Sequence, residues 1–361
     1  MALTWTPPPS WRGPSKRPRK AQDPVNSNTN RARTPLLFAV ITAAVLTAAV
    51  VSICVGKYSI SIRDIGAILI GAPVDDMTLR VFTTLRLSRT LMAIIAGIGL
   101  GMAGSVYQII FKNPLASPDI IGIAGGANLG AAVAIVSVST SGMIAIAAGA
   151  FWGGLAAVVC VMLLVRATRA RATSAYVLAG IVINAVSKAV IMALKYFADP
   201  ENELAAMEYW EMGTFGNTTM SKFLSILPMF AVGFLGILLL RRQIELMSLS
   251  DNECRALGVR LKPTRAAVLA FSTLMVVSII SVTGLISFAG LIAPHTARLM
   301  LRRNNATTIL LSGMVGAFVV LTADILARVL YSAELPISIL TTVIGVPILA
   351  YFLCARGREI S

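Results

Sequence analysis

The chain has 361 residues, of which 57% are apolar and only 13% are charged, and its mean hydropathy is +0.81. Soluble domains carry about 25% charged residues, so this composition excludes a disordered chain and argues against an ordinary soluble enzyme. The net charge of +15 fits the basic cytoplasmic loops of a membrane protein better than a nucleic-acid partner, which we do not expect.

Residues 1–35 differ from the rest of the chain. They hold seven of the 16 prolines and seven basic residues, and they show no apolar period. Segments of this kind bury too little apolar surface to fold. We therefore expect a disordered cytoplasmic tail over 1–35 and a transmembrane domain over 36–358. We expect no signal peptide, because the first apolar run is long enough to span a membrane.

Ten apolar runs follow the tail, and each approaches the roughly 20 residues that an α-helix needs to cross a bilayer. They cover residues 36–55, 91–111, 119–139, 143–165, 174–197, 223–240, 266–283, 285–301, 308–326 and 337–355. The run at 285–301 is the weakest, because a proline and a histidine interrupt it. The sequence predicts an all-α polytopic membrane protein, with an amphipathic stretch over 56–88 on its outer surface.

The distribution of charge predicts the orientation of these spans. With the N-terminus inside, cytoplasmic segments hold 22 Lys and Arg against six Asp and Glu, whereas external segments hold nine and ten. Lys and Arg collect on the cytoplasmic side of membrane proteins. We therefore expect both termini in the cytoplasm, together with the long internal loop at 241–264.

Small residues recur every four positions in several of the runs, as at Gly97 and Gly101, and at Gly149 and Gly153. In lipid, this spacing lets the backbones of two helices approach closely. The glycines predict a tightly packed bundle but do not identify what it carries.

Several chemical signatures are missing from the sequence. It has no GxxxxGK[ST], HExxH or GxSxG motif, and its single histidine and four separated cysteines do not predict a metal site. The acids nearest the runs, Asp119, Asp324 and Glu334, fall near run ends, whereas ion-coupled carriers use acids deep in the membrane. We expect no catalysis, cofactor or bound metal in this chain. Energy would come from another subunit; an ion-coupled secondary transporter and a structural membrane protein are the alternatives.

Four stretches carry a more specific signal. They read LRLSRTL at 85–91, KNPLASP at 112–118, GLISFAGLIAPHTAR at 284–298, and ADILAR at 323–328 followed by ELP at 334–336. In this order they resemble the FecCD or BtuC-like permeases of ABC importers for ferric siderophores, haem and cobalamin. The resemblance covers about residues 36–358 and departs from the family pattern at Ser88, usually Pro, and at Ser338, usually Gly.

The resemblance implies a ten-helix permease domain in the cell membrane that imports a ferric siderophore, with haem and cobalamin as alternatives. It also implies a second permease subunit, identical or homologous, two cytoplasmic ABC ATPases and an external substrate-binding protein. Seven motif residues are expected to have structural roles. They are Asn113, Pro114, Gly290, Pro294, His295, Glu334 and Pro336.

Three arginines form the first candidate site. Arg86 and Arg89 lie three positions apart and, like Arg328, fall at outer ends of the runs, against the charge bias. In the resembled family, arginines at the matching positions accept glutamates of the binding protein. Arg–carboxylate pairs are directional and suit docking. We expect binding-protein docking here, with interfacial anchoring of the helix ends as the alternative.

A second candidate site lies in the loop 241–264. Asp251 near the start and Gly258 near the end of the stretch LSDNECRALGV (249–259) indicate a short helix with an N-terminal acid and a glycine stop. The stretch resembles the family's coupling segment, which sits in a cleft of the ATPase; a solvated loop is the alternative. The candidate coupling residues are Asp251, Glu253, Arg255, Ala256, Leu257 and Gly258.

Lys188 lies about 14 residues into the run 174–197, roughly 21 Å along a helix. An ammonium at such a depth costs about 2.5–3.5 kcal/mol on insertion scales. Lys188 either reaches the interface with its long stem or faces a wet pathway. Asn184, four residues earlier, would share its helix face, so both are candidate pathway residues.

Overall fold

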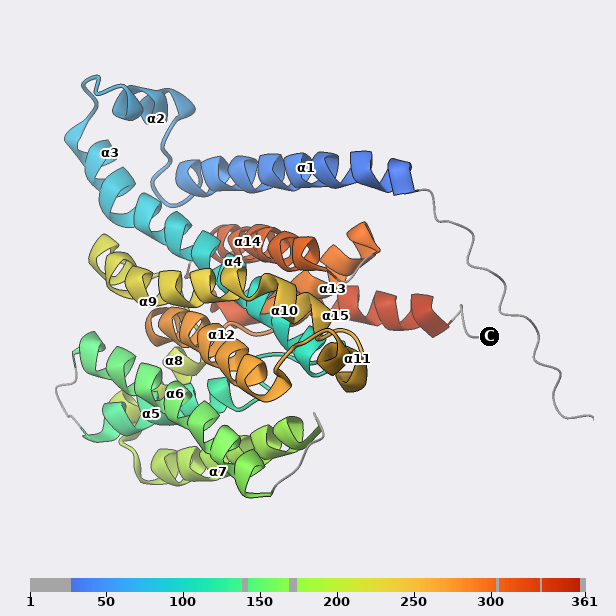
Figure 1. The fold of residues 1–361 in the computed structure, drawn as a ribbon. Coiled ribbons are helices and arrows are strands. Elements are labelled where there is room, and N and C mark those ends of the chain that lie inside the picture. Colours follow the sequence, from blue (N-terminus) through green and yellow to red (C-terminus); the bar gives the residue numbers. More distant parts are fainter. Residues whose placement is uncertain (1–26, 138–141, 169–173, 303–304, 332, 358–361) are drawn as a thin grey trace, which may run out of the picture.

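The computed structural model describes residues 27–137, 142–168, 174–302, 305–331 and 333–357. All of the regular secondary structure in these ranges is helical. The prediction of an all-α fold is therefore confirmed (Figure 1).

Each of the ten predicted spans coincides with one helix. These are α1 (Ser27–Cys54), α4 (Leu87–Ile110), α5 (Ile123–Ser137), α6 (Met143–Ala167), α7 (Ser174–Phe197), α9 (Met220–Leu239), α12 (Leu261–Thr283), α13 (Ala289–Leu301), α14 (Ala306–Val329) and α15 (Ile337–Gly357). Seven spans in the described chain are long and apolar enough to cross a membrane, by length and composition alone. Helices α5 and α13, with 15 and 13 residues, are shorter than the others.

Short helices connect the spans. They are α2 (Ile62–Leu69), α3 (Asp76–Arg80), the π-helix η1 (Val81–Arg86), the π-helix η2 (Pro200–Leu204), α8 (Ala205–Met212), α10 (Arg241–Leu246) and α11 (Asp251–Ala256). Helix α3 and η1 continue directly into α4, so residues Asp76–Ile110 form one helical rod of 35 residues. In the stretch expected to be amphipathic, Ile65 and Ile68 of α2 pack against a small buried cluster formed by Ile60, Val81 and Phe82.

Several predicted boundaries are wrong by three residues or more, and three of them bear on the predicted tail and on the two shortest spans. Helix α1 begins at Ser27, so residues 27–35 are helical rather than disordered, and residues 1–26 of the predicted tail lie outside the described residues. Helix α5 begins at Ile123 rather than 119, because Gly122, at a φ of +91°, follows a run of turns. Helix α13 begins at Ala289 rather than 285, because the backbone takes positive φ at both Gly284 and Phe288.

Helix α4 passes through the middle of the bundle and is the most buried of the seven long spans (Figure 1). Its buried side chains include Met92, Met102 and Tyr107, all no more than 1% exposed. Helices α13 and α14 pack against α4, and α1 packs on α14. Helices α5, α6 and α7 form a second group that reaches α4 through α12. Residues at both ends of α4 therefore touch elements from distant parts of the sequence.

Glycines mark the closest helix contacts, as the four-residue spacing predicts. A Cβ at Gly130 would lie 2.0 Å from the carbonyl oxygen of Gly149, and one at Gly153 would lie 2.3 Å from that of Gly126. Real Cβ atoms do not approach a backbone oxygen so closely, so α5 and α6 can pack at this distance only without side chains there. The prediction of a tightly packed bundle is confirmed.

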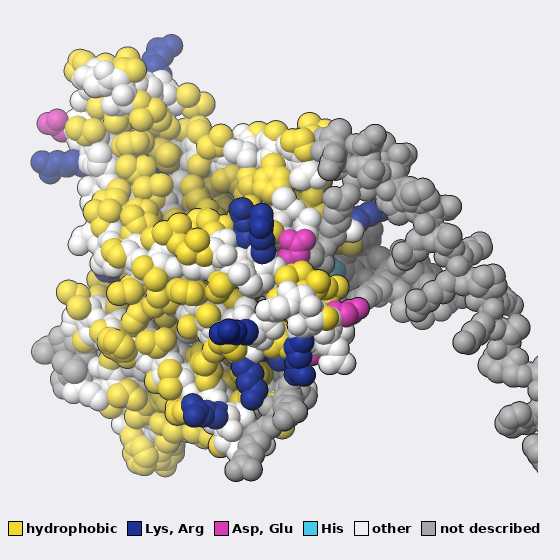
Figure 2. Space-filling view, in the orientation of Figure 1, with side chains coloured by type: hydrophobic (Ala, Val, Ile, Leu, Met, Phe, Trp, Pro, Cys, Tyr) yellow, Lys and Arg dark blue, Asp and Glu magenta, His cyan; other side chains and the backbone are white. Residues whose placement is uncertain are grey.

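The two candidate sites lie at opposite ends of this bundle. Helices α2 and α3 lie at one end, whereas α11 lies at the other, where α1 begins and α15 ends (Figure 1). Apolar side chains cover much of the visible surface between the ends, and most of the visible Lys and Arg side chains gather toward the α11 end (Figure 2). This arrangement matches a membrane protein that presents a different surface at each side of the bilayer.

Candidate functional site

The three candidate docking arginines come together in one charged cluster with two carboxylates. Arg89 donates from Nε to Asp324 Oδ1 at 2.9 Å, and from Nη1 to both carboxylate oxygens of Glu334, at 2.9 and 2.8 Å. Arg328 Nη2 lies 3.1 Å from Asp324 Oδ2. Asp324 therefore joins two arginines, whereas Glu334 pairs with Arg89.

Arg86 and Arg328 also form hydrogen bonds with the last turn of α1 and with the backbone that follows it. Arg86 donates to the carbonyl oxygens of Val55 and Tyr58, at 2.8 and 3.2 Å. Arg328 donates to the same Val55 carbonyl at 3.0 Å. A Cβ at Gly56 would collide with the Arg86 guanidinium, so glycine leaves the room that this side chain needs. The cluster thus fastens the end of α1 to α4 and α14.

Burial separates the members of this cluster. Arg86, Arg89 and Arg328 are 8%, 8% and 9% exposed, and the side chain of Asp324 is fully buried. The side chain of Glu334 is 40% exposed. The three arginines are therefore buried against partners within the chain, and Glu334 has the most exposed side chain of the cluster.

The two departures from the family pattern form local hydrogen bonds. Ser88 Oγ donates to the carbonyl oxygen of Thr84 at 2.8 Å, within the rod that carries the arginines. Ser338 Oγ donates to the carbonyl of Leu285 at 2.8 Å and accepts from the backbone N–H of Ser287 at 3.3 Å. Ser338 thus holds the non-helical segment that delays the start of α13.

Helix α11 has the caps that its sequence indicates. Ser250 Oγ accepts from the backbone N–H of Glu253, and the Glu253 carboxylate accepts from the N–H of Ser250 at 2.8 Å, which is a capping box. Gly258 follows the helix with a φ of +81°, where glycine carries no steric cost. The predicted helix and its glycine stop are confirmed.

The base of α11 is fixed to the bundle through Asp251. Its Oδ1 lies 3.2 Å from Lys112 Nζ, just after α4, and 3.0 Å from Arg265 Nη2 on α12. Burial alone would raise the pKa of Asp251, but the hydrogen bond from Lys112 and the charge of Arg265 hold it below its ordinary value. The carboxylate is therefore ionised at neutral pH, and it joins α11 to both helices.

The outer face of α11 is free of the bundle. Cys254 is fully buried beneath the helix, where its thiol lies 3.0 Å from the carbonyl oxygen of Leu246. The other residues predicted for coupling, beyond the half-buried Asp251, are exposed. They are Glu253, Arg255, Ala256, Leu257 and Gly258. Leu257, the residue that caps the C-terminus of α11, thus presents an exposed apolar side chain.

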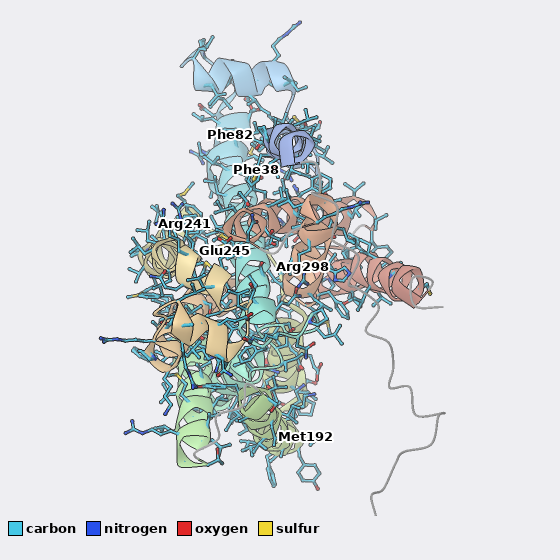
Figure 3. All side chains as sticks on the ribbon, turned by 45° about the vertical axis from the view of Figure 1, so that its right-hand side comes forward. Phe38, Phe82, Met192, Arg241, Glu245 and Arg298 are labelled. Carbon is cyan, nitrogen blue, oxygen red and sulfur yellow. The ribbon has the colours of Figure 1, made fainter. Side chains whose placement is uncertain are left out.

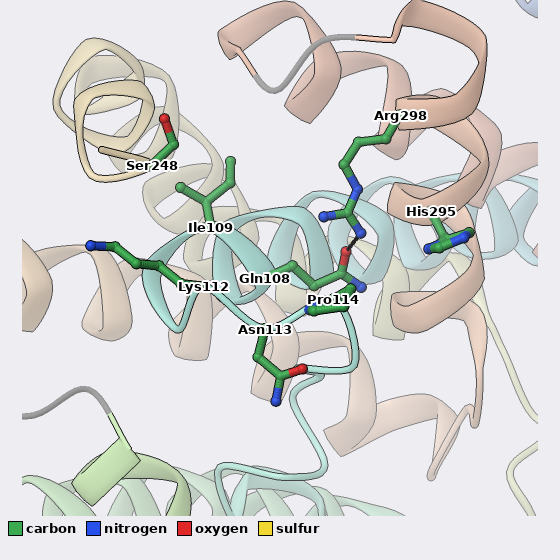
Figure 4. A pocket seen from close by; sticks show the side chains of 8 residues that line it. All are labelled: Gln108, Ile109, Lys112, Asn113, Pro114, Ser248, His295 and Arg298. Carbon is green, nitrogen blue, oxygen red and sulfur yellow. Dashed lines mark hydrogen bonds between the residues drawn. The ribbon is translucent and has the colours of Figure 1, made fainter. Parts of the chain in front are cut away.

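A cavity of about 350 Å³ lies near this helix (Figure 4). It is lined by Gln108, Ile109, Lys112, Asn113, Pro114, Ser248, His295 and Arg298. The guanidinium of Arg298 on α13 donates to the side-chain carbonyl of Gln108 on α4. His295, expected to make a packing or polar contact, is half-buried in this lining.

The remaining motif residues occupy turns and close contacts. Asn113 Oδ1 accepts from the backbone N–H of Leu115 at 2.9 Å, in a turn that follows the end of α4. Gly290 lies so near α4 that a Cβ at Gly104 would collide with its carbonyl oxygen. Pro294 is buried within α13, and Pro336 precedes α15. These positions fit the expected structural roles.

The two candidate pathway residues have different surroundings on α7. The Asn184 amide donates to the backbone carbonyl of Asp119 at 2.6 Å, which ties α7 to the turns before α5. Lys188, one turn later, is exposed, and so is Met192, which points away from the bundle (Figure 3). Asn184 thus has a structural bond, whereas Lys188 lies on an open surface of the single subunit.

Comparison with known proteins decides the family. The model of the FecCD transport family matches residues 41–355. The chain belongs to the FecCD transport family. It is therefore the permease of an ABC importer and a multi-pass protein of the inner membrane, as its long apolar helices indicate.

Relatives of this FecCD permease are named for different cargoes. The molybdate import system permease protein MolB of Haemophilus influenzae is 33% identical over 317 residues, 86% of this chain and 91% of that protein. The probable iron chelatin transport system permease protein of Helicobacter pylori is 34% identical over 269 residues, 74% and 81% of the two chains. An inward-facing structure assigned to the metal-chelate type of ABC transporter is 30% identical with a TM-score of 0.80, covering 89% of this chain and 99% of that one.

Sequence reasoning missed the partners of the FecCD motif residues. Arg328 and Asp324 lie four residues apart on one helix, a spacing that could have indicated their pairing. Arg89 and Glu334 lie 245 positions apart, and no local pattern relates them. The ion pairs of Asp251 with Lys112 and Arg265 likewise depend on how the helices pack, which the sequence pattern does not show.

Proposed function

We propose that this FecCD permease imports a ferric siderophore. An external binding protein delivers the chelate, two cytoplasmic ATPases supply the energy, and a second permease, identical or homologous, completes the pathway. The family match over residues 41–355 carries the proposal. The iron chelatin relative and the metal-chelate transporter of the same fold support a chelated metal as cargo. Haem, cobalamin and molybdate are the competing substrates.

Uptake by cells tests this choice of substrate. A deletion strain complemented with the gene should accumulate radioactive iron from a ferric siderophore, and excess haem, cobalamin or molybdate should not compete. Competition by one of these three would assign the permease to that substrate instead. Equal iron uptake with and without the gene would remove the siderophore proposal.

We infer that α11 couples the permease to its ATPase. Its exposed face, from Glu253 to Gly258, is available to a partner, and Asp251 joins the helix to α4 and α12. A movement of α11 would therefore be transmitted through the Asp251 carboxylate to the end of α4 and to α12. This assignment places the α11 end and both chain termini in the cytoplasm, which agrees with the excess of Lys and Arg there.

The arginine cluster would then face the outside and receive carboxylates of the binding protein. We expect Arg86→Gln to weaken binding-protein affinity about tenfold, because a charge-assisted hydrogen bond contributes about 1.5–3 kcal/mol. The loss should be larger at low salt, where screening is weak. Affinity is measured with the permease–ATPase complex in nanodiscs at two salt concentrations.

Arg80→Gln is the matched control, since Arg80 is exposed on α3 near the same end but lies outside the cluster. Arg86→Gln keeps an amide that can donate to the Val55 carbonyl, which limits damage to the fold. An affinity that is unchanged by Arg86→Gln and by Arg328→Gln at low salt would remove the docking assignment.

A substitution of Lys188 tests whether this residue lines the translocation pathway. Ferric siderophores are often anionic, so a cation beside the path would lower the barrier for their entry. We expect Lys188→Met to preserve folding and ATPase coupling, and to slow uptake of an anionic chelate more than uptake of a neutral one. An equal effect on both chelates, or none, would instead make Lys188 an anchor at the membrane interface.

A further inference from the structure

Glu334 differs from every other member of the arginine cluster. The three arginines and Asp324 lie on helices or at their starts and are nearly fully buried, whereas Glu334 belongs to the connection between α14 and α15 and its side chain is 40% exposed. It is thus the only carboxylate of this cluster that reaches the surface.

The bonds of Arg89 show what Glu334 covers. The Nε edge of the guanidinium faces the buried Asp324, and Nη1 faces outward to the two oxygens of Glu334. An arginine presents its N–H groups in a fixed fork that suits carboxylates. A carboxylate arriving from outside would need the outward part of this fork, which Glu334 already occupies.

Glu334 lies against a backbone position that bears no side chain. A Cβ at Gly216, in the connection before α9, would lie 2.7 Å from Glu334 Oε2, so glycine at this position provides the space that the carboxylate occupies. Exchange of Glu334 for another carboxylate would keep an anion on Arg89, so the ion pair would be replaced rather than lost. Asp324, which is fully buried between two arginines, cannot be exchanged in this way.

We propose that Glu334 is a resident carboxylate that occupies the outward edge of Arg89 until a carboxylate of the binding protein displaces it. The inference rests on the docking role proposed above for the cluster. Glu334 keeps Arg89 paired in the undocked permease. Because it competes with the carboxylate of the binding protein for Arg89, it lowers the affinity of the permease for that protein. The binding protein gains Arg89 only by moving Glu334 aside, so complexes form less tightly than the three arginines alone would allow.

The test is the affinity of the binding protein for the full permease–ATPase complex in nanodiscs carrying Glu334→Gln. Removing the competing charge should tighten binding about three- to fivefold, the equivalent of an exposed ion pair. Glu334→Ala should shift the affinity in the same direction, which guards against an effect peculiar to the amide. Unchanged or weaker binding in both variants would overturn the proposal.

Glu208→Gln is the matched control. Glu208 also forms an ion pair, with Lys195 at 2.7 Å, and its side chain is 48% exposed, but it is not in the arginine cluster. Its loss removes the same charge and should leave affinity within about twofold. Equal tightening by Glu208→Gln would show a general effect of charge and would overturn the proposal as well.

The variant Arg86→Gln separates this inference from the docking assignment on which it rests. If Arg86→Gln weakens binding while Glu334→Gln does not tighten it, docking stands and Glu334 only orients Arg89. If neither variant changes affinity, the cluster is not the docking site and both assignments fail.

Discussion

Replacing Asp324 by asparagine is expected to destabilise the permease by about 3–5 kcal/mol, because it leaves buried charge uncompensated. Asp324 is fully buried and pairs with Arg89 and Arg328, which lie on different helices. Its amide would leave two buried guanidinium groups with one partly exposed carboxylate. A loss of this size is a large share of the roughly 5–15 kcal/mol that stabilises a typical protein. The midpoint of thermal unfolding of the purified protein in detergent measures it.

Asp76→Asn provides the control for this prediction. Asp76 is an exposed acid in the first turn of α3, and surface substitutions usually change stability by no more than about 0.5 kcal/mol. The two variants remove the same charge and differ in burial and in partners. Equal midpoints for Asp324→Asn and the unchanged protein would mean that the cluster does not hold α4 and α14 together.

Replacing Gly258 by valine should weaken association with the ATPase by more than about tenfold and abolish uptake, while membrane insertion is retained. The backbone at Gly258 has a φ of +81°, and a non-glycine residue in such a conformation costs about 1–3 kcal/mol. No atom lies within 4 Å of a Cβ built at this position. The effect would therefore come from the backbone, which would leave the turn and change the direction of α11. Co-purification of the ATPase with tagged permease measures association.

Gly66→Val is the control for that variant. Gly66 also has open space around its Cβ position, but it lies on α2 at the other end of the bundle and has no positive φ. Valine is a better helix former than glycine, so this variant should keep α2 helical and leave ATPase association unchanged. If the ATPase still co-purifies with the Gly258→Val protein and transport persists, α11 is not the coupling element.

Much of this fold follows from local patterns in the sequence. The ten helices follow from runs of apolar residues, and the close contacts of Gly130 with Gly149 follow from small residues at four-residue spacing. Helix α11 follows from an acid and a glycine at its two ends. Each of these patterns lies within one segment or depends on one backbone preference, so it can be recognised without knowing how distant segments pack.

The rest depends on contacts between distant segments or on backbone angles. The apolar run continues through residues 285–288, so hydropathy gives no sign that positive φ at Gly284 and Phe288 delays α13. The three arginines were identified by type and position, but their burial against Asp324 and Glu334 depends on how α4 and α14 cross. From hydropathy alone, Asp324 is only an acid near the end of an apolar run. That pattern does not show that its side chain is buried inside the bundle.

Import of a ferric siderophore through this permease, driven by ATP, can be measured in proteoliposomes. The permease is reconstituted with its ATPase, ATP is enclosed on the ATPase side, and binding protein loaded with radioactive ferric siderophore is added to the other side. Iron accumulation should require both ATP and the binding protein and should be insensitive to proton or sodium gradients. Accumulation driven by an ion gradient without ATP would instead make the chain a secondary transporter.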